Sequence, residues 1–209
     1  MNVNGYEIEP GANLANANFE GADLAGANLQ DANLRFANFT GANLADCNLR
    51  NSALQQTTFV GADLRGAVLA QANLEGVDFT DANLERADLT YANLTEASLK
   101  RVNLSCAILV EANLANVDLT GGRLVRADLT DAVLSKSALV GANLKDANFE
   151  GAVLIQADLE GVDLRGANLK GTVLKDSNLR EAILPGVDLS SASLSGARFT
   201  GAILENVIW

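Results

Sequence analysis

The sequence contains no histidine and only two cysteines, Cys47 and Cys106, among its 209 residues. Without histidine, the commonest general base and the commonest metal ligand are both missing. Serine and threonine are frequent, but no Ser-His-Asp triad can form from them. Two cysteines do not make a disulfide framework. We therefore expect a protein that is not an enzyme and that binds no metal and no cofactor.

Long apolar runs are also missing. No stretch of eighteen apolar residues is present to cross a membrane. The segment from Met1 to Gly11 is polar, and it lacks the basic flank and apolar core of a signal peptide. We expect a cytoplasmic protein, with a lumenal or periplasmic location only if a leader has been removed.

Basic residues are outnumbered, since 15 Lys and Arg face 26 Asp and Glu and leave a net charge of −11. An acidic surface repels nucleic acid and anionic membranes and attracts basic partners. Aromatic residues are scarce at 5%, whereas apolar residues reach 48% and are mostly Ala and Leu. We expect a thin, regular core and a protein partner, with no direct contact to nucleic acid or membrane.

The dominant feature of the chain is a five-residue repeat. Every fifth residue from Leu14 to Leu204 is Leu or Phe, and Trp209 takes the next place. The residue two places earlier is usually Ala, and the one between is usually Asn or Asp. A five-residue spacing drifts around an α-helix and forms no fixed apolar stripe. In a strand, Ala and Leu point one way and Asn the other, so each pentad predicts a three-residue strand followed by a corner.

The phenylalanines indicate how many sides each coil has. Phe19, Phe39, Phe59 and Phe79 are spaced by 20 residues, and Phe199 falls in the same series. A coil of four pentads stacks these rings on one face, whereas a three-sided coil scatters them. We predict an all-β quadrilateral parallel β-helix of about ten coils. Its expected domains are an N-terminal cap over 1–11 and one uninterrupted solenoid over 12–209.

The repeat resembles that of the pentapeptide-repeat family. Ala12-Asn13-Leu14 and Ala127-Asp128-Leu129 show the motif, which covers nearly the whole chain. The resemblance implies a right-handed coil, and long arrays of this kind are similar to those of photosynthetic bacteria. Members of the family include regulators that bind DNA gyrase and a regulator of heterocyst differentiation. This chain departs from the gyrase-binding members because no loops interrupt its repeat and no dimerising helix follows the last coil.

The four faces differ in charge, and we name each by its first central residue. The Leu29 face comprises the pentads centred on Leu29 and every twentieth residue after it. It holds seven acidic residues against Arg50 and Lys170. A basic partner is expected to dock there, on Asp88, Glu111, Asp128, Asp131 and Glu150. The alternative interpretation is a solvated wall that keeps the rod soluble.

The remaining candidates are less charged. On the Leu14 face, centred on Leu14 and every twentieth residue after it, Val133, Val153 and Val173 replace the usual Asn, and Ile155 lies beside them. Such a ladder either favours strand geometry or marks a partner surface. The Asn and Asp columns are expected to bond local backbone rather than a metal.

The last two residues, Ile208 and Trp209, either close the final coil or form a weak homodimer end to end. The two cysteines have different expected places in the coil. Cys47 falls in the Ala position and should be buried, whereas Cys106 falls in a corner and should be exposed. They are separated by about three coils, which is beyond the reach of a disulfide, so both should be free thiols.

These observations favour a non-enzymatic repeat scaffold for protein–protein interaction. The alternative is an acidic DNA mimic that regulates DNA gyrase or another DNA-binding protein. Duplex DNA carries one charge per about 1.7 Å. Because basic residues offset much of the acidic charge of this rod, the mimicry would be partial.

Overall fold

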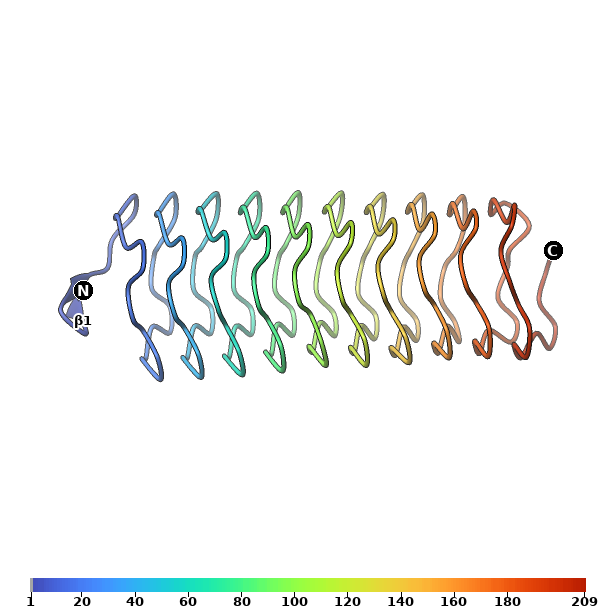
Figure 1. Cartoon of the computed structure of the whole chain (residues 1–209), viewed down its shortest axis with the longest axis horizontal. Coiled ribbons are helices and arrows are strands. Elements are labelled where there is room, and N and C mark those ends of the chain that lie inside the picture. The colour runs from blue at the N-terminus through green and yellow to red at the C-terminus, as the bar shows by residue number, and fades with distance from the viewer. Residues whose placement is uncertain (1) are drawn as a thin grey trace.

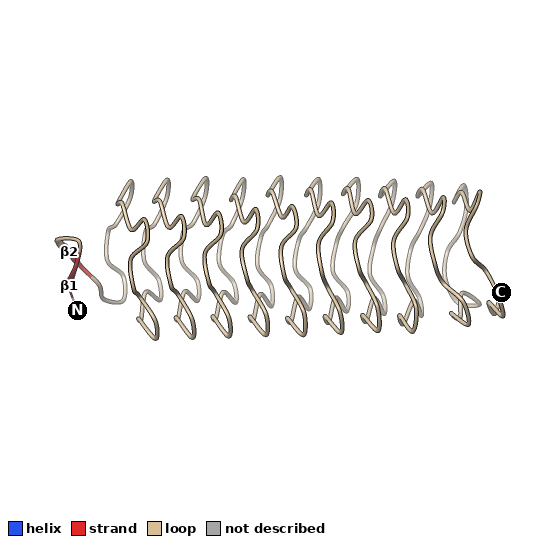
Figure 2. Ribbon diagram, turned by 90° about the horizontal axis from the view of Figure 1, so that it is seen from below, coloured by secondary structure: helices blue, strands red, loops and turns tan. Residues whose placement is uncertain are grey.

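The computed structural model describes residues 2–209 as a rod of stacked coils with the two ends of the chain at opposite ends of the rod (Figure 1). Two short strands, β1 (Asn2–Val3) and β2 (Tyr6–Glu7), pair antiparallel before the first coil. The remaining chain is a regular succession of isolated β-bridges and turns (Figure 2). Within the described residues no helix occurs.

Each coil consists of four pentads, one for each side of a square, as predicted. Parallel bridges join the same pentad position in successive coils, for example Asn13 to Asn33 and Val133 to Val153. The predicted three-residue strands were too long, because only one residue of each pentad, the one before the central Leu or Phe, forms a bridge. The corners take up the other residues, so each side of the square is too short for a regular strand.

Backbone hydrogen bonds tie each coil to the next. The N–H of Leu14 donates to the carbonyl of Asn33 at 2.7 Å, and the N–H of Asn33 donates back to the carbonyl of Ala12 at 2.9 Å. The corner residue contributes a further backbone bond: the N–H of Asn16, for example, donates to the carbonyl of Arg35 at 2.8 Å. The same pattern recurs along most of the rod, so neighbouring coils are joined by several bonds. It is interrupted on the Leu29 face between 167–171 and 187–191, where the N–H of Gly171 donates to Oγ of Ser191 at 3.1 Å in place of the backbone ladder.

The corners explain why Asn and Asp are so frequent. At every corner except that of Ser191, the chain turns through a residue in the left-handed conformation, such as Asn16 with φ 61°. The N–H of Ala17 then donates to the carbonyl of Leu14 and closes the turn. One N–H in the pentad then lacks a backbone partner. The side chain of Asn or Asp accepts it, as Asn18 Oδ1 accepts the N–H of Glu20 at 3.1 Å. The prediction that these side chains bond local backbone is confirmed.

The interior is filled by the Leu or Phe column and the Ala column of each side, which are buried along nearly the whole rod. The rings of Phe19, Phe39, Phe59 and Phe79 stack with centroids 4.9–5.0 Å apart. This spacing matches the distance between neighbouring strands. The predicted phenylalanine column is therefore confirmed, and with it the register that assigns every other side chain to a face.

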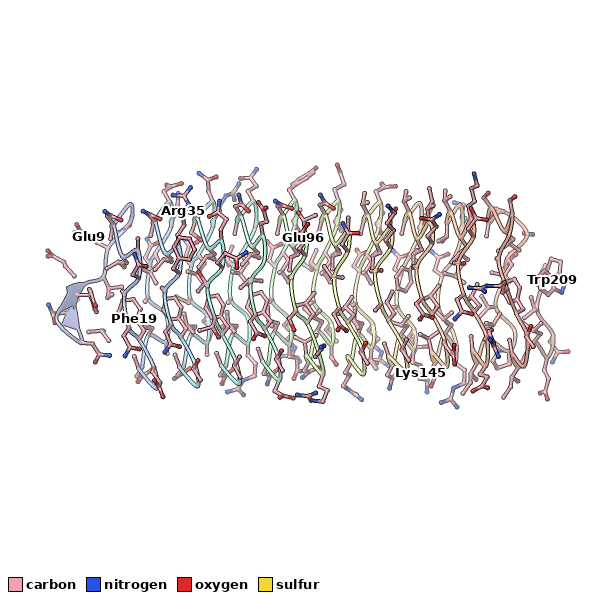
Figure 3. All side chains as sticks on the ribbon, viewed as in Figure 1. Glu9, Phe19, Arg35, Glu96, Lys145 and Trp209 are labelled. Atoms are coloured by element: carbon pink, nitrogen blue, oxygen red, sulfur yellow. The ribbon has the colours of Figure 1, made fainter. Side chains whose placement is uncertain are left out.

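The two ends of the rod differ. At the first coil, the ring of Tyr6 lies 5.1 Å from that of Phe19, and Ile8 is buried in the core. In the last coil the core residues are only partly buried, and Trp209 meets the ring of Phe199 edge-on at 5.6 Å. Figure 3 shows Phe19 and Trp209 near opposite ends of the rod.

Candidate protein-binding surfaces

The Leu29 face brings together the carboxylates that the sequence singled out. Asp88, Ile108 and Asp128 are consecutive members of one bridged column. Glu111 and Asp131 follow one another in successive coils at the adjoining corner, both in left-handed conformation. Glu150 belongs to the same face one coil further on. The register therefore gathers the five predicted residues on one wall of the rod.

Asp88 and Asp128 are held in place by their own pentads. Oδ1 of Asp88 accepts the N–H and the hydroxyl of Thr90 at 3.0 and 2.6 Å. Asp128 makes the same two bonds to Thr130, at 3.1 and 2.6 Å, and also accepts Nδ2 of Asn148 at 3.1 Å. Both carboxylates are half-buried. They therefore support the corner as well as contributing negative charge to the face.

Glu150 is partly neutralised. Its Oε1 lies 2.9 Å from Nζ of Lys170, and the hydrogen bond and charge of Lys170 lower the pKa of Glu150. An exposed pair of this kind contributes little to stability. It does reduce the charge available to a partner, so Glu150 is a weaker candidate than the other four carboxylates.

Sequence reasoning missed the apolar centre of this wall. Ile108 replaces Asn or Asp in the column and is 43% exposed, between Asp88 and Asp128. The exposed ring of Tyr91 is tied to the same wall, because its hydroxyl donates to Oε1 of Glu111 at 2.9 Å. That hydrogen bond and the nearby negative charge raise the pKa of Tyr91. The signal in the sequence was an Ile between two Asp residues in the same column.

The valine ladder has the predicted arrangement. Val133 bridges to Val153, and Val153 bridges to Val173, so the three stack coil on coil. Only Val133 is exposed, at 37%, while Val153, Val173 and Ile155 are half-buried. The apolar surface is therefore smaller than the sequence suggested. A partner for it remains a prediction.

The cysteines lie where they were expected. Cys47 is buried and Cys106 is exposed, and both are free thiols. Cys47 donates to the carbonyl of Ala27 at 3.0 Å, and burial raises the pKa of Cys47 to about 12. Ile208 and Trp209 are 55% and 62% exposed. Their proposed end-to-end contact remains a prediction.

Within residues 2–209, no group of three or more Cys, Asp or Glu side chains is placed to hold a metal ion. No segment of this described part of the chain forms a helix long and apolar enough to cross a membrane.

The fold defines a class of protein, the right-handed quadrilateral β-helices, in which a filled core is surrounded by four flat faces. Within that class, the chain belongs to the pentapeptide-repeat family. Two family models match it and together cover nearly all of the solenoid. The model described as a pentapeptide repeat region matches 12–88 and 37–109, and that described as pentapeptide repeats (8 copies) matches 107–146, 142–180 and 172–208.

Solved structures of the family resemble the chain to different degrees. HetL, a pentapeptide repeat protein involved in heterocyst differentiation regulation from the cyanobacterium Nostoc, is 33% identical, with 95% of this chain and 87% of HetL covered and a TM-score of 0.49. QnrB1, a plasmid-mediated fluoroquinolone resistance protein, is 20% identical over 75% of this chain and 84% of its own, with a TM-score of 0.42. Rfr23 from the cyanobacterium Cyanothece is 28% identical over 58% and 63%, with a TM-score of 0.26. No curated protein matches the chain.

Proposed function

We propose that this protein is a non-enzymatic scaffold whose Leu29 face binds a basic segment of another protein. The observation that carries the proposal is the exposed Ile108 between Asp88 and Asp128, with Glu111 and Asp131 along the adjoining corner. An apolar centre with a charged rim is typical of protein interfaces. A cytoplasmic location remains a prediction from the sequence.

The charge of this face supports a basic partner. Between Arg50 and Lys170 the pentads of the Leu29 face contain no Lys or Arg. The carboxylates in the middle of the rod are therefore not offset by a cation on their own face. Complementary charge steers association and selects partners, while burial of an apolar centre supplies much of the affinity.

The variants that test the face must preserve the fold. Reversing Asp88 or Asp128 to Lys would remove the acceptor of a corner N–H together with the charge. Asn keeps an acceptor oxygen and already occupies this position in many pentads. The test protein therefore carries Asp88→Asn, Asp128→Asn and Asp131→Asn.

The matched control carries the same number of neutralised carboxylates on other faces. Asp78→Asn and Asp158→Asn replace two acids of the same repeat position, each of which accepts the N–H two residues on. Asp176→Asn replaces a corner acid that, like Asp131, lies over the glycine of the next coil. Both triple variants change the net charge equally. A difference in binding between them therefore shows whether the Leu29 face is the site of binding.

The measurement is fluorescence anisotropy with a labelled peptide of alternating Lys and Leu. We expect the Leu29-face variant to bind at least about tenfold more weakly, which is ~1.4 kcal/mol, and the control to bind nearly as the natural protein does. Ile108→Asn should also weaken binding by removing the apolar centre. Equal weakening in both triple variants would show only a general attraction to an acidic rod, and the proposal would be wrong.

DNA gyrase is the alternative partner predicted from the family resemblance. Inhibition of supercoiling by purified gyrase tests it. If the protein inhibits gyrase and the Leu29-face variant does not, the basic segment belongs to a DNA-binding enzyme. If neither protein inhibits gyrase, the alternative is wrong. The peptide measurement then remains the test of the Leu29 face.

We also propose that Ile208 and Trp209 form a weak end-to-end contact between two copies. Both side chains are more than half exposed, and the core residues of their coil are only partly buried. Trp209→Ser should reduce self-association measured by sedimentation equilibrium at high protein concentration. A monomer at every concentration would contradict this contact.

A further inference from the structure

A second charged surface lies at the corner where the Leu24 face meets the Leu29 face. The Leu24 face comprises the pentads centred on Leu24 and every twentieth residue after it. Two surface hollows follow this corner along the rod, and Glu85 lines both. The larger hollow is lined by four cations, Arg123, Arg126, Lys145 and Arg165, and we call it the basic groove.

The groove exists because short and long side chains alternate along this corner. Ser105 occupies a position where most pentads carry a longer or more exposed side chain, and it is 8% exposed. Cys106 follows it at the corner. Arginines stand on the coils before and after, at Arg86 and Arg126, in the same corner position as Cys106. The small residues leave a depression between long cationic side chains.

The four cations of the groove differ in whether they already bond to another side chain. Arg165 is held by Asp163 through bonds of 2.8 and 2.5 Å. Arg123 donates to the hydroxyl of Ser105 at 3.0 Å. Arg126 and Lys145 are exposed, and within the described chain neither of them, nor Arg123, forms an ion pair. Figure 3 shows Lys145 at the outer edge of the rod.

The balance of charge in the groove is positive in a strongly acidic protein. Its four cations face three carboxylates, those of Glu85, Asp146 and Asp163. The Leu24 face as a whole has no positive net charge, because it also carries acidic residues further along the rod. Six of the 15 basic residues of the chain belong to the Leu24 face, so the cations are concentrated and not spread.

We propose that the basic groove binds a short acidic segment of a protein partner. This site is separate from the acidic wall and goes beyond the function proposed for it. Guanidinium groups match carboxylates with two parallel hydrogen bonds, and Arg126 and Arg123 are available to form them. A partner with an acidic segment beside a basic one would contact the groove and the Leu29 face together.

The neighbouring acidic wall argues against a long polyanion. Duplex DNA presents one charge per about 1.7 Å, so it would extend from the groove over Asp128 and Asp131 and be repelled. A peptide can confine a few carboxylates to the groove. The repulsion therefore selects a short acidic segment over nucleic acid.

The spacing of the cations suggests the form of the segment. Arg126 of the groove and Arg86, which lines the neighbouring smaller hollow, occupy one corner column two coils apart, which is about 10 Å. A polyproline-II peptide repeats every three residues, or about 9 Å, so carboxylates three residues apart face the same way at a similar spacing. The probe is therefore a peptide of Glu-Pro-Pro repeats, and its control is the same peptide with Gln in place of Glu.

The exposed thiol of Cys106 provides a reporter inside the groove. Cys106 lies between Arg86 and Arg126 in the corner column and is one of the lining residues. Cys47, the other thiol of the chain, is buried, so a neutral alkylating agent reacts with Cys106 first. The rate of N-ethylmaleimide addition, followed by mass spectrometry, therefore measures occupancy of the groove.

The variant pair for this test uses the repeat to match positions. Arg126→Gln with Lys145→Gln removes two exposed cations of the groove that form neither an ion pair nor the hydrogen bond to Ser105 that Arg123 makes in the described chain. Lys136→Gln with Lys175→Gln removes two cations of the Leu14 face from the same two places in the pentad. Circular dichroism of both variants checks that the coil is retained.

We expect the Glu peptide to slow alkylation of Cys106 and the Gln peptide to leave it unchanged. Loss of two charge-assisted contacts should weaken the apparent affinity about tenfold or more in the groove variant but not in the control variant. No protection by the Glu peptide, or equal loss in both variants, would overturn the proposal. It would also fail if inorganic phosphate or single-stranded DNA protected Cys106 better than the peptide, since the groove would then recognise another anion.

Discussion

The stacked phenylalanines give a quantitative test of the packing. Phe39 lies between Phe19 and Phe59, with ring centroids 5.0 and 4.9 Å away. Phe149 is equally buried but belongs to the opposite side of the coil, where no ring of the described chain contacts it. Leu is the usual residue at both positions. Phe39→Leu and Phe149→Leu therefore make the same change in side-chain size, and only the first removes ring contacts.

Each aromatic pair contributes about 0.5–1.5 kcal/mol beyond burial of its area. Because Phe39 has two ring neighbours, Phe39→Leu should cost about 1–3 kcal/mol more than Phe149→Leu. Urea unfolding followed by circular dichroism measures the difference, provided that the slope with urea is the same in both variants. A double-mutant cycle with Phe59→Leu isolates one pair. If Phe39→Leu costs no more than Phe149→Leu, the stack contributes nothing and the reasoning is refuted.

Three further predictions follow from the corners, the core and the first coil. Asp128→Ala should lower the free energy of unfolding by about 1–3 kcal/mol, because the N–H of Thr130 loses its acceptor, whereas Asp128→Asn should leave it nearly unchanged. Urea unfolding compares the two variants, and equal losses of stability would count against the role of the acceptor. The pKa of Cys47 is raised by burial from 9.0 to about 12, so its contribution to stability is full below pH 9 and is lost as the pH rises toward 12, by about 1.4 kcal/mol per pH unit. Cys47→Ala should therefore lose less stability than the natural protein between pH 8 and pH 10.5, and identical losses would contradict this cause. Deletion of residues 1–9 should lower the melting temperature if they cap the first coil, and an unchanged melting curve would show that they do not.

Most of the fold could be predicted from the sequence because one short pattern repeats without interruption. The regular spacing of Phe19, Phe39, Phe59 and Phe79 selected a square coil, and the structure has that register. The strands were predicted too long because side-chain alternation indicates which way residues point. It does not indicate how many of them pair before the chain turns.

The candidate sites were harder to predict, because they depend on which side chains bond one another. The sequence placed Asp128 and Glu150 on one wall but could not show that Lys170 neutralises Glu150 or that Asp128 supports a corner. Counting charge by face also concealed the basic groove. That site depends on a small residue, Ser105, lying beside long cations, and on Asp163 engaging only one of them.

The assignment of side chains to surfaces depends on a coil of four pentads, and the distance between two spin labels tests this directly. Phe36 and Lys136 are exposed and occupy the same corner position in different coils. With Cys47→Ala and Cys106→Ser to remove the natural thiols, labels at Phe36→Cys and Lys136→Cys can be measured by double electron–electron resonance. A square coil places them five coils apart, at about 24 Å with a narrow distribution. A three-sided coil of three pentads would place them about 32 Å apart along the rod. That longer distance, or a broad distribution, would contradict the register and the surfaces assigned from it.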